Sequence, residues 1–199
     1  MNLLRRFGFL APLAALSLAG CGLNSVPTAE EQVNAAWGNS QADYQRRADL
    51  IPNLVATVKG YAQQEKTVLT EVTNARANAT RVQLNASDLS DPAKVQAFNE
   101  AQGRLTQAII PLQRLQEAYP DLKSNQNFLA LQDQLEGTEN RINASRRDYN
   151  TAVQAYNTRI RTFPDAIGAK IFYGAKPKVP FEAAAAAQQA PPVNFGNAS

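Results

Sequence analysis

Apolar residues recur at every third or fourth position along most of the chain, which is the spacing of one face of an α-helix. The first such stretch follows Thr28 and Glu31, whose three-residue spacing predicts a capping box at a helix start, with Thr28 as N-cap. Pro52 lies inside this stretch and predicts a kink, because proline removes a hydrogen bond and crowds the preceding turn. The expected core positions are Val33, Trp37, Tyr44, Ala48, Ile51, Val55, Val58, Ala62, Leu69 and Val72.

Two further helices are predicted downstream. Asp91 and Pro92 are typical of an N-cap followed by proline at the first helical position, and Pro111 predicts a second kink. A final helix over residues 124–163 would be about 60 Å long at 1.5 Å per residue. Its buried stripe is expected at Phe128, Leu131, Leu135, Thr138, Ile142, Ser145, Tyr149, Val153, Tyr156, Ile160 and Phe163. The pattern predicts an all-α fold, an elongated antiparallel bundle of about four long helices with kinks near Pro52 and Pro111.

The N-terminus reads MNLLRRFGFLAPLAALSLAGC, with two arginines, a short apolar run and then small residues. This order is typical of a secretory signal peptide, and Leu18-Ala19-Gly20-Cys21 resembles the bacterial lipobox. We therefore predict a lipoprotein signal peptide over residues 1–20, acyl chains such as palmitate on Cys21, and a short spacer over 21–27. The alternatives are a membrane-spanning helix over residues 7–23, which would be short for a span of about 20 residues, or a free thiol.

The rest of the composition narrows the chemistry. Histidine is absent and Cys21 is the only cysteine among 199 residues, which excludes histidine catalysis, histidine-ligated metals and internal disulfides. We therefore expect no enzymatic activity and no cofactor. The full sequence has 20 basic and 17 acidic residues, and removing Arg5 and Arg6 with the signal peptide leaves 18 basic residues, a net charge of +1. Because the mature protein is then nearly neutral, we expect no nucleic-acid partner.

Three stretches resemble the LemA family: RRADLIPNLVATVKGYA, YPDLKSNQNFLALQDQLEGTENRINASRRDYNTAVQAYNTRIRTFP and KIFYGAKPKVPFEA. The resemblance covers most of residues 30–182 and implies a membrane-attached antiparallel helical bundle with no established enzymatic activity. Family members commonly begin with a transmembrane segment, whereas this chain carries the lipobox-like sequence. We place the bundle at residues 28–173, followed by a low-complexity tail at 174–199 that we expect to be disordered.

Several side chains are candidate contact residues. An amphipathic segment could contact a membrane or partner, or instead fold over the bundle's end, through Phe163, Ile167, Lys170, Ile171 and Phe172. Two arginine pairs could form an anionic-ligand patch or stay as separate solvated charges: Arg46, Arg47, Arg146 and Arg147. Glu136 and Glu139 are expected in solvated surface ion pairs. Hydrogen-bond partners for buried tyrosines and Trp37 are expected among Asn53, Asn140, Asn150 and Asn157.

These observations favour a non-catalytic, lipid-anchored protein of the bacterial cell envelope that presents a rigid bundle to another envelope protein. One alternative is a membrane-organising protein acting through the bundle or residues 163–178. A weaker alternative is an envelope ligand-binding protein. Gly22 follows Cys21, at the position where an aspartate would resemble an inner-membrane retention signal. In a cell with two membranes we therefore expect the protein to be anchored in the outer membrane, facing the periplasm. Self-association into a homo-oligomer is a further alternative.

Overall fold

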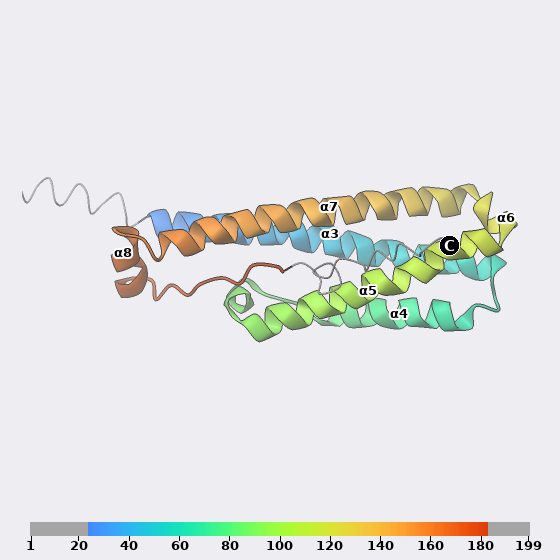
Figure 1. Cartoon of the computed structure of the whole chain (residues 1–199), viewed down its shortest axis with the longest axis horizontal. Helices are drawn as coiled ribbons and strands as arrows, with labels where there is room; N and C mark the ends of the chain where they lie inside the picture. Colours follow the sequence, from blue (N-terminus) through green and yellow to red (C-terminus); the bar gives the residue numbers. More distant parts are fainter. Residues whose placement is uncertain (1–23, 183–199) are drawn as a thin grey trace, which may run out of the picture.

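The computed structural model describes residues 24–182, and these form an elongated all-α bundle (Figure 1). The elements in chain order are α3 (Ser25–Tyr61), α4 (Lys66–Arg81), the 3₁₀ helix η1 (Ala86–Ser90), α5 (Pro92–Ala118), α6 (Pro120–Lys123), α7 (Gln126–Arg159) and α8 (Asp165–Ile171). Helices α3 and α7 run side by side in opposite directions, and the shorter α4 and α5 form a second antiparallel pair against them (Figure 1). The predicted all-α bundle of four long helices is confirmed.

Helix α3 begins earlier than the capping-box pattern predicts. It starts at Ser25, with Asn24 in the N-cap position, and the Thr28 hydroxyl donates a 2.7 Å hydrogen bond to the Asn24 carbonyl. Thr28 therefore lies in the first turn, and its prediction as N-cap is wrong. The added turn packs Val26 into the core, which stabilises the longer helix. The predicted start of α5 is confirmed, because the Asp91 carboxylate accepts hydrogen bonds from the next two backbone N–H groups.

Neither internal proline ends its helix. Helix α3 continues through Pro52 to Tyr61, and α5 continues through Pro111 to Ala118. Because Pro52 has no N–H, the carbonyl of Ala48, four residues earlier, loses its helical donor. Arg76 of α4 supplies a replacement through a 2.6 Å hydrogen bond from its Nε to that carbonyl. A side chain from the neighbouring helix thus compensates for the proline.

The apolar core consists of two clusters at opposite ends of the bundle. One packs the start of α3 against the second half of α7 and includes Val33, Trp37, Phe98, Ile142, Tyr149, Val153 and Tyr156. The other packs the end of α3 against α4, α5 and the start of α7 and includes Ile51, Leu54, Val58, Leu69, Val72, Leu105, Leu112, Phe128 and Leu135. The predicted stripes are confirmed in their main positions. Ile160 is only half-buried and Phe163 is 82% exposed, because α7 ends at Arg159.

Residues 174–182 form an extended segment, here called the C-terminal strap, which runs back along the bundle beside α3 and α7 (Figure 1). The Val179 N–H donates a 2.8 Å hydrogen bond to the Leu89 carbonyl, and the Lys178 and Phe181 side chains are buried. The predicted boundary between the bundle and a disordered tail at residue 174 is therefore too early. Alternating buried and exposed positions in a short extended segment give no helical period, so the periodic pattern does not reveal this packing.

Candidate functional site

A partly buried polar layer separates the two apolar clusters. Its central residue is Arg47, only 1% exposed, and we define the layer as Arg47, Gln102, Thr106 and Glu139. Arg47 lies between Tyr44 and Ile51 on α3, which belong to different clusters. In the same way, Gln102 lies between Phe98 and Leu105 on α5, where Thr106 comes directly after Leu105. Glu139 lies between Leu135 and Ile142 on α7.

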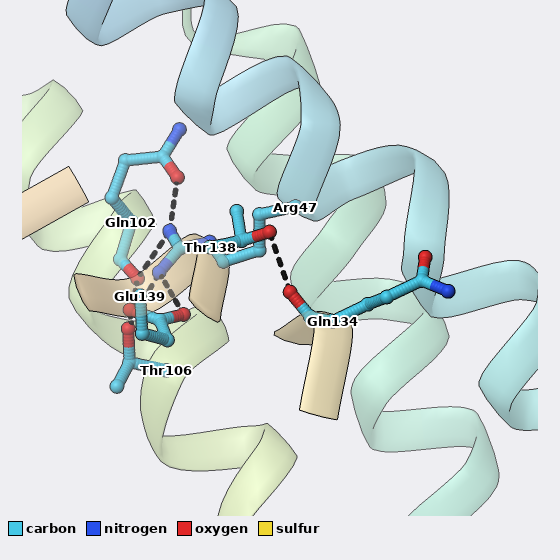
Figure 2. A network of polar contacts seen from close by, with 6 residues as sticks. All are labelled: Arg47, Gln102, Thr106, Gln134, Thr138 and Glu139. Carbon is cyan, nitrogen blue, oxygen red and sulfur yellow. Dashed lines mark hydrogen bonds and ion pairs between the residues drawn. The ribbon is translucent and has the colours of Figure 1, made fainter. Parts of the chain in front are cut away.

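The guanidinium of Arg47 is bound from two neighbouring helices (Figure 2). One terminal nitrogen donates to Glu139 Oε1 of α7 at 2.8 Å and to Thr106 Oγ1 of α5 at 2.9 Å, and the other donates to Gln102 Oε1 of α5. The Gln102 amide in turn donates a 3.2 Å hydrogen bond to the Ala79 carbonyl of α4. The layer therefore joins all four long helices at one level, and a change in helix register would break these bonds.

The other buried polar residues near the layer bond within their own helices. The Thr138 hydroxyl donates to the Gln134 carbonyl at 2.7 Å, as Figure 2 shows, and the Ser145 hydroxyl donates to the Ile142 carbonyl at 3.3 Å. Small hydroxyl side chains satisfied in this way can occupy buried stripe positions without a partner on another helix. They bring α3 and α7 close together and leave Glu139 as the carboxylate that contacts Arg47.

The layer has the chemistry of a structural network. The terminal nitrogens of Arg47 donate to a carboxylate and to neutral oxygens, whereas its buried Nε has no hydrogen-bond partner among the described residues. A guanidinium provides neither a general base nor a nucleophile. Within residues 24–182, no group of three or more histidine, cysteine, aspartate or glutamate side chains is placed to hold a metal ion. Sequence analysis assigned Glu139 to a solvated surface ion pair. That assignment is wrong, because the partner of Glu139 is buried.

Two asparagines of α7 hold the C-terminal strap. The Asn157 side chain exchanges two hydrogen bonds with the backbone of Lys178, at 2.7 and 2.8 Å, and Asn150 does the same with Phe181, at 2.8 Å each. Seven helical residues rise about 10 Å, and three extended residues span about 10 Å, so the two spacings match. Both asparagines were expected to bond buried aromatic side chains. They instead bind the backbone of the strap.

The strap closes an aromatic cluster formed by Trp37, Tyr44, Phe98, Tyr149 and Phe181. The Phe181 ring centroid lies 4.7 Å from that of Tyr149 and 5.7 Å from that of Trp37. Trp37 Nε1 donates to the Leu84 carbonyl at 3.2 Å, and the Tyr149 hydroxyl donates to the Val179 carbonyl at 3.0 Å. Trp37 and Tyr149 thus bond backbone carbonyls, and the rings of the cluster pack against one another.

Burial sets the protonation of the core tyrosines. It raises the pKa of Tyr149 well above the usual range, and burial together with Glu30 raises the pKa of Tyr156 to about 12. Burial also raises the pKa of Tyr44, although the nearby positive charges of Arg146 and Arg47 oppose the shift. All three phenols are therefore neutral at physiological pH and act as packing groups, and the Tyr149 hydroxyl also donates the hydrogen bond to the Val179 carbonyl.

Replacing Asn157 with alanine removes both hydrogen bonds to Lys178 and is expected to lower the free energy of unfolding by about 1–2 kcal/mol. Urea unfolding followed by circular dichroism measures this change. Asn143→Ala is the matched control, because Asn143 is exposed on the same helix and should change stability by no more than about 0.5 kcal/mol. Equal effects of the two substitutions would show that the strap is not held through Asn157.

The predicted contact residues of the amphipathic segment lie together at one end of the bundle. Phe163 precedes α8, Ile167, Lys170 and Ile171 lie on it, and Phe172 follows it, and all five are exposed. We call these five residues the α8 tip. Ala169, on the opposite side of α8, is buried against the core. The helix therefore covers the end of the bundle with its small residues and exposes its large apolar ones.

The four arginines proposed as an anionic patch are not one surface. Arg47 is buried and paired with Glu139, whereas Arg46, the next residue round the helix, is exposed. Arg146 donates a 2.7 Å hydrogen bond to the Glu182 carbonyl and lies over the Phe181 ring, and Arg147 is exposed. Consecutive helical residues point about 100° apart, so neither arginine pair shares a face. The structure therefore does not bring the four arginines together on one exposed surface.

Two further candidate sites are the predicted lipidation site and a surface groove. Cys21 and the predicted signal peptide lie outside the described residues. A shallow open groove lies between α7 and the strap, lined by Asn150, Val153, Gln154, Asn157, Thr158, Arg161 and Pro180. Asn150 and Asn157 already bond the strap backbone, so their amide groups are occupied within the fold.

Within residues 24–182, no helix has the length and apolar character needed to cross a membrane.

The fold and its polar layer place the protein in the class of elongated all-α bundles. Their interior consists of packed apolar side chains and a polar network that joins the helices. The chain matches the LemA family over residues 36–195 and belongs to this family. A protein LemA of Metamycoplasma hominis is 23% identical over 141 residues, which cover 70% of this chain and 60% of that protein. Magnetosome proteins MamQ 1 and MamQ 2 of Paramagnetospirillum magneticum are each 26% identical over 157 residues, covering 71% of this chain and 58% of theirs.

The chain thus spans about three fifths of the length of the curated relatives it matches. Family membership makes it a membrane-associated bacterial envelope protein, in a family not known for enzymatic activity.

Proposed function

We propose that this chain is a non-catalytic lipoprotein, anchored through Cys21, that presents a rigid helical bundle to another protein of the cell envelope. One observation carries the proposal. Helix α3 begins at Ser25, four residues after Cys21, and runs for 37 residues through Pro52 without a break. Its length of about 55 Å holds the far end of the bundle well above a membrane that contains the anchor.

The interior of the bundle supports a binding role over a catalytic one. Its buried cations Arg47 and Lys178 are already paired with Glu139 and Glu30, and its buried tyrosines are neutral. A filled core stabilises a shape and leaves the outer surface for recognition. The partner is then an envelope protein met away from the lipid surface. In a cell with two membranes, the anchor lies in the outer membrane and the bundle faces the periplasm.

The experiment is proximity labelling in cells, with the wild type beside Cys21→Ala. We expect no mature form of the variant in the membrane fraction, because no acyl chain can be attached to alanine. The variant should also fail to label the neighbouring proteins that the wild type labels. Gly22→Asp is the matched control, since it keeps Cys21 and should remain membrane-bound while its neighbours become those of the inner membrane. Retention of both the membrane fraction and the neighbours by Cys21→Ala would contradict the proposal.

A membrane-organising role is a second candidate, favoured by the exposed apolar side chains of the α8 tip. The ligand-binding alternative has the groove beside the strap as its candidate location. The Asn150 and Asn157 amides of this groove are bonded to the strap. Arg161 and Gln154 are then its main remaining polar groups. We therefore favour the protein-binding proposal over both.

A further inference from the structure

The α8 tip is an exposed apolar cluster. Phe163 is 82% exposed, Ile171 69% and Phe172 66%, and Ile167 lies one turn from Ile171 on the same face. Single exposed apolar residues are common on proteins, but four large ones gathered at one end need an explanation. The other large exposed hydrophobics of residues 24–160 are less exposed and lie singly, at Tyr61, Ile110 and Leu129.

The tip is held in a fixed place on the bundle. Ala169 is buried, and its carbonyl accepts a 3.0 Å hydrogen bond from the Ala175 N–H. The Arg159 guanidinium lies 3.9 Å from the Asp165 carboxylate of α8 and donates a 3.4 Å hydrogen bond to the Ser25 carbonyl of α3. These contacts fix α8 at the end where α3 begins, as Figure 1 shows, so the apolar face cannot fold inward without breaking them.

The charge around the tip is positive. Residues 159–178 contain five basic residues and one acidic residue, Asp165, which is paired with Arg159. Lys178 is buried and paired with Glu30, but Arg161, Lys170 and Lys176 are exposed. Exposed cations around apolar side chains match the surface of a membrane that contains anionic lipids, because the cations meet headgroups while the apolar groups enter the acyl boundary.

The tip also lies beside the predicted anchor. Asn24 lies three residues after Cys21, a span of at most about 11 Å, and Asn24 caps α3 at the same end of the bundle as α8. We propose that the α8 tip inserts Phe163, Ile167, Ile171 and Phe172 into the interfacial region of the membrane that holds Cys21. This inference rests on the lipid anchor of the proposed function.

The two attachments act together. The α8 tip alone is too small for strong membrane binding, since lasting attachment requires two membrane signals or a much larger apolar surface. An acylated Cys21 keeps the start of α3, and with it the α8 tip at the same end of the bundle, near the lipid, so binding of the tip becomes an intramolecular step at high effective concentration. A second contact with the membrane, added to the anchor, restricts the directions in which the bundle can project.

The test uses the full chain, purified with its acyl chains and reconstituted into vesicles of phosphatidylethanolamine and phosphatidylglycerol. A polarity-sensitive fluorophore is attached to Ile171→Cys, and the matched control carries it on Leu129→Cys. Leu129 is an exposed apolar residue near the start of α7, at the opposite end of the bundle. Wild-type protein exposed to the same dye reports whether the Cys21 thiol is blocked.

We expect the dye at position 171 to shift its emission to shorter wavelength, to resist quenching by aqueous iodide and to be quenched by nitroxide-labelled lipid. The dye at position 129 should show the opposite behaviour. Phe163→Ser combined with Phe172→Ser should return the dye at 171 to iodide quenching, while unchanged thermal unfolding shows that the bundle is intact. Phosphatidylcholine vesicles should weaken the effect at 171, because they carry no net negative charge.

The contrary outcomes are distinct. If the protein floats with the vesicles and iodide quenches both positions equally, the membrane contact of the tip is wrong and the anchor stands. If position 171 resists iodide without quenching by lipid nitroxide, a second copy of the chain covers the tip and the lipid contact is wrong. If wild-type protein takes up the dye and does not float, the anchor fails and the tip inference fails with it.

Discussion

Glu139→Ala is expected to lower the free energy of unfolding by about 3 kcal/mol, at the low end of the range of about 3–5 kcal/mol for breaking a buried ion pair. The substitution leaves the Arg47 guanidinium buried with only neutral partners, Gln102 and Thr106. The loss lies at the low end because the Glu139 side chain is 30% exposed, so water can approach the vacated site. Equilibrium unfolding in urea measures the change.

Glu136→Ala is the control for this prediction, because Glu136 is exposed on the same helix and should change stability by no more than about 0.5 kcal/mol. A combined Arg47→Met and Glu139→Leu variant tests the cause. Since it removes the buried charge and fills the space with apolar atoms, it should recover much of the stability that Glu139→Ala loses. A similar small loss for Glu136→Ala and Glu139→Ala would show that the layer does not stabilise the bundle.

Phe181→Ala is expected to lower the free energy of unfolding by about 3 kcal/mol. The Phe181 side chain is 4% exposed and lies in the aromatic cluster, between Trp37 and Tyr149 and beneath the Arg146 guanidinium. Truncation leaves a cavity in the cluster, and only the strap can relax to fill it, so we expect the low end of the range of about 3–5 kcal/mol. Thermal and urea unfolding both report the change.

Phe163→Ala provides the comparison, because Phe163 is the same residue type but 82% exposed and should change stability by no more than about 0.5 kcal/mol. The pair thus separates the two regions that follow α7. A large loss for Phe181→Ala with none for Phe163→Ala is the expected result. Equal losses would mean that the strap is not part of the core.

The helical part of the fold was predictable because one helix face repeats along the sequence. The stripe of α7 from Phe128 to Tyr156 has the expected spacing, and its residues are buried in the two clusters, with Leu131 only half-buried. Asp91 and Pro92 also mark a helix start locally, since an N-cap bonds its own next residues. Such signals are contained within a few turns of chain and do not depend on the neighbouring helices.

The polar layer and the strap were not predictable in the same way. Arg47 and Glu139 are 92 positions apart, and an arginine pair on a helix is usually solvated, so the pattern favoured a surface. The seven-residue spacing of Asn150 and Asn157 was visible in the sequence, but its meaning depends on an extended segment that begins after α8. Likewise, the α8 tip was identified as amphipathic, yet its exposure depends on where α7 ends.

The most direct test of the lipid-anchor proposal is mass spectrometry of the N-terminal peptide of protein purified from the membrane fraction. The account predicts a peptide that begins at Cys21, with Met1–Gly20 removed and acyl chains on the cysteine. A peptide that retains residues 1–20 with an unmodified Cys21 would contradict it.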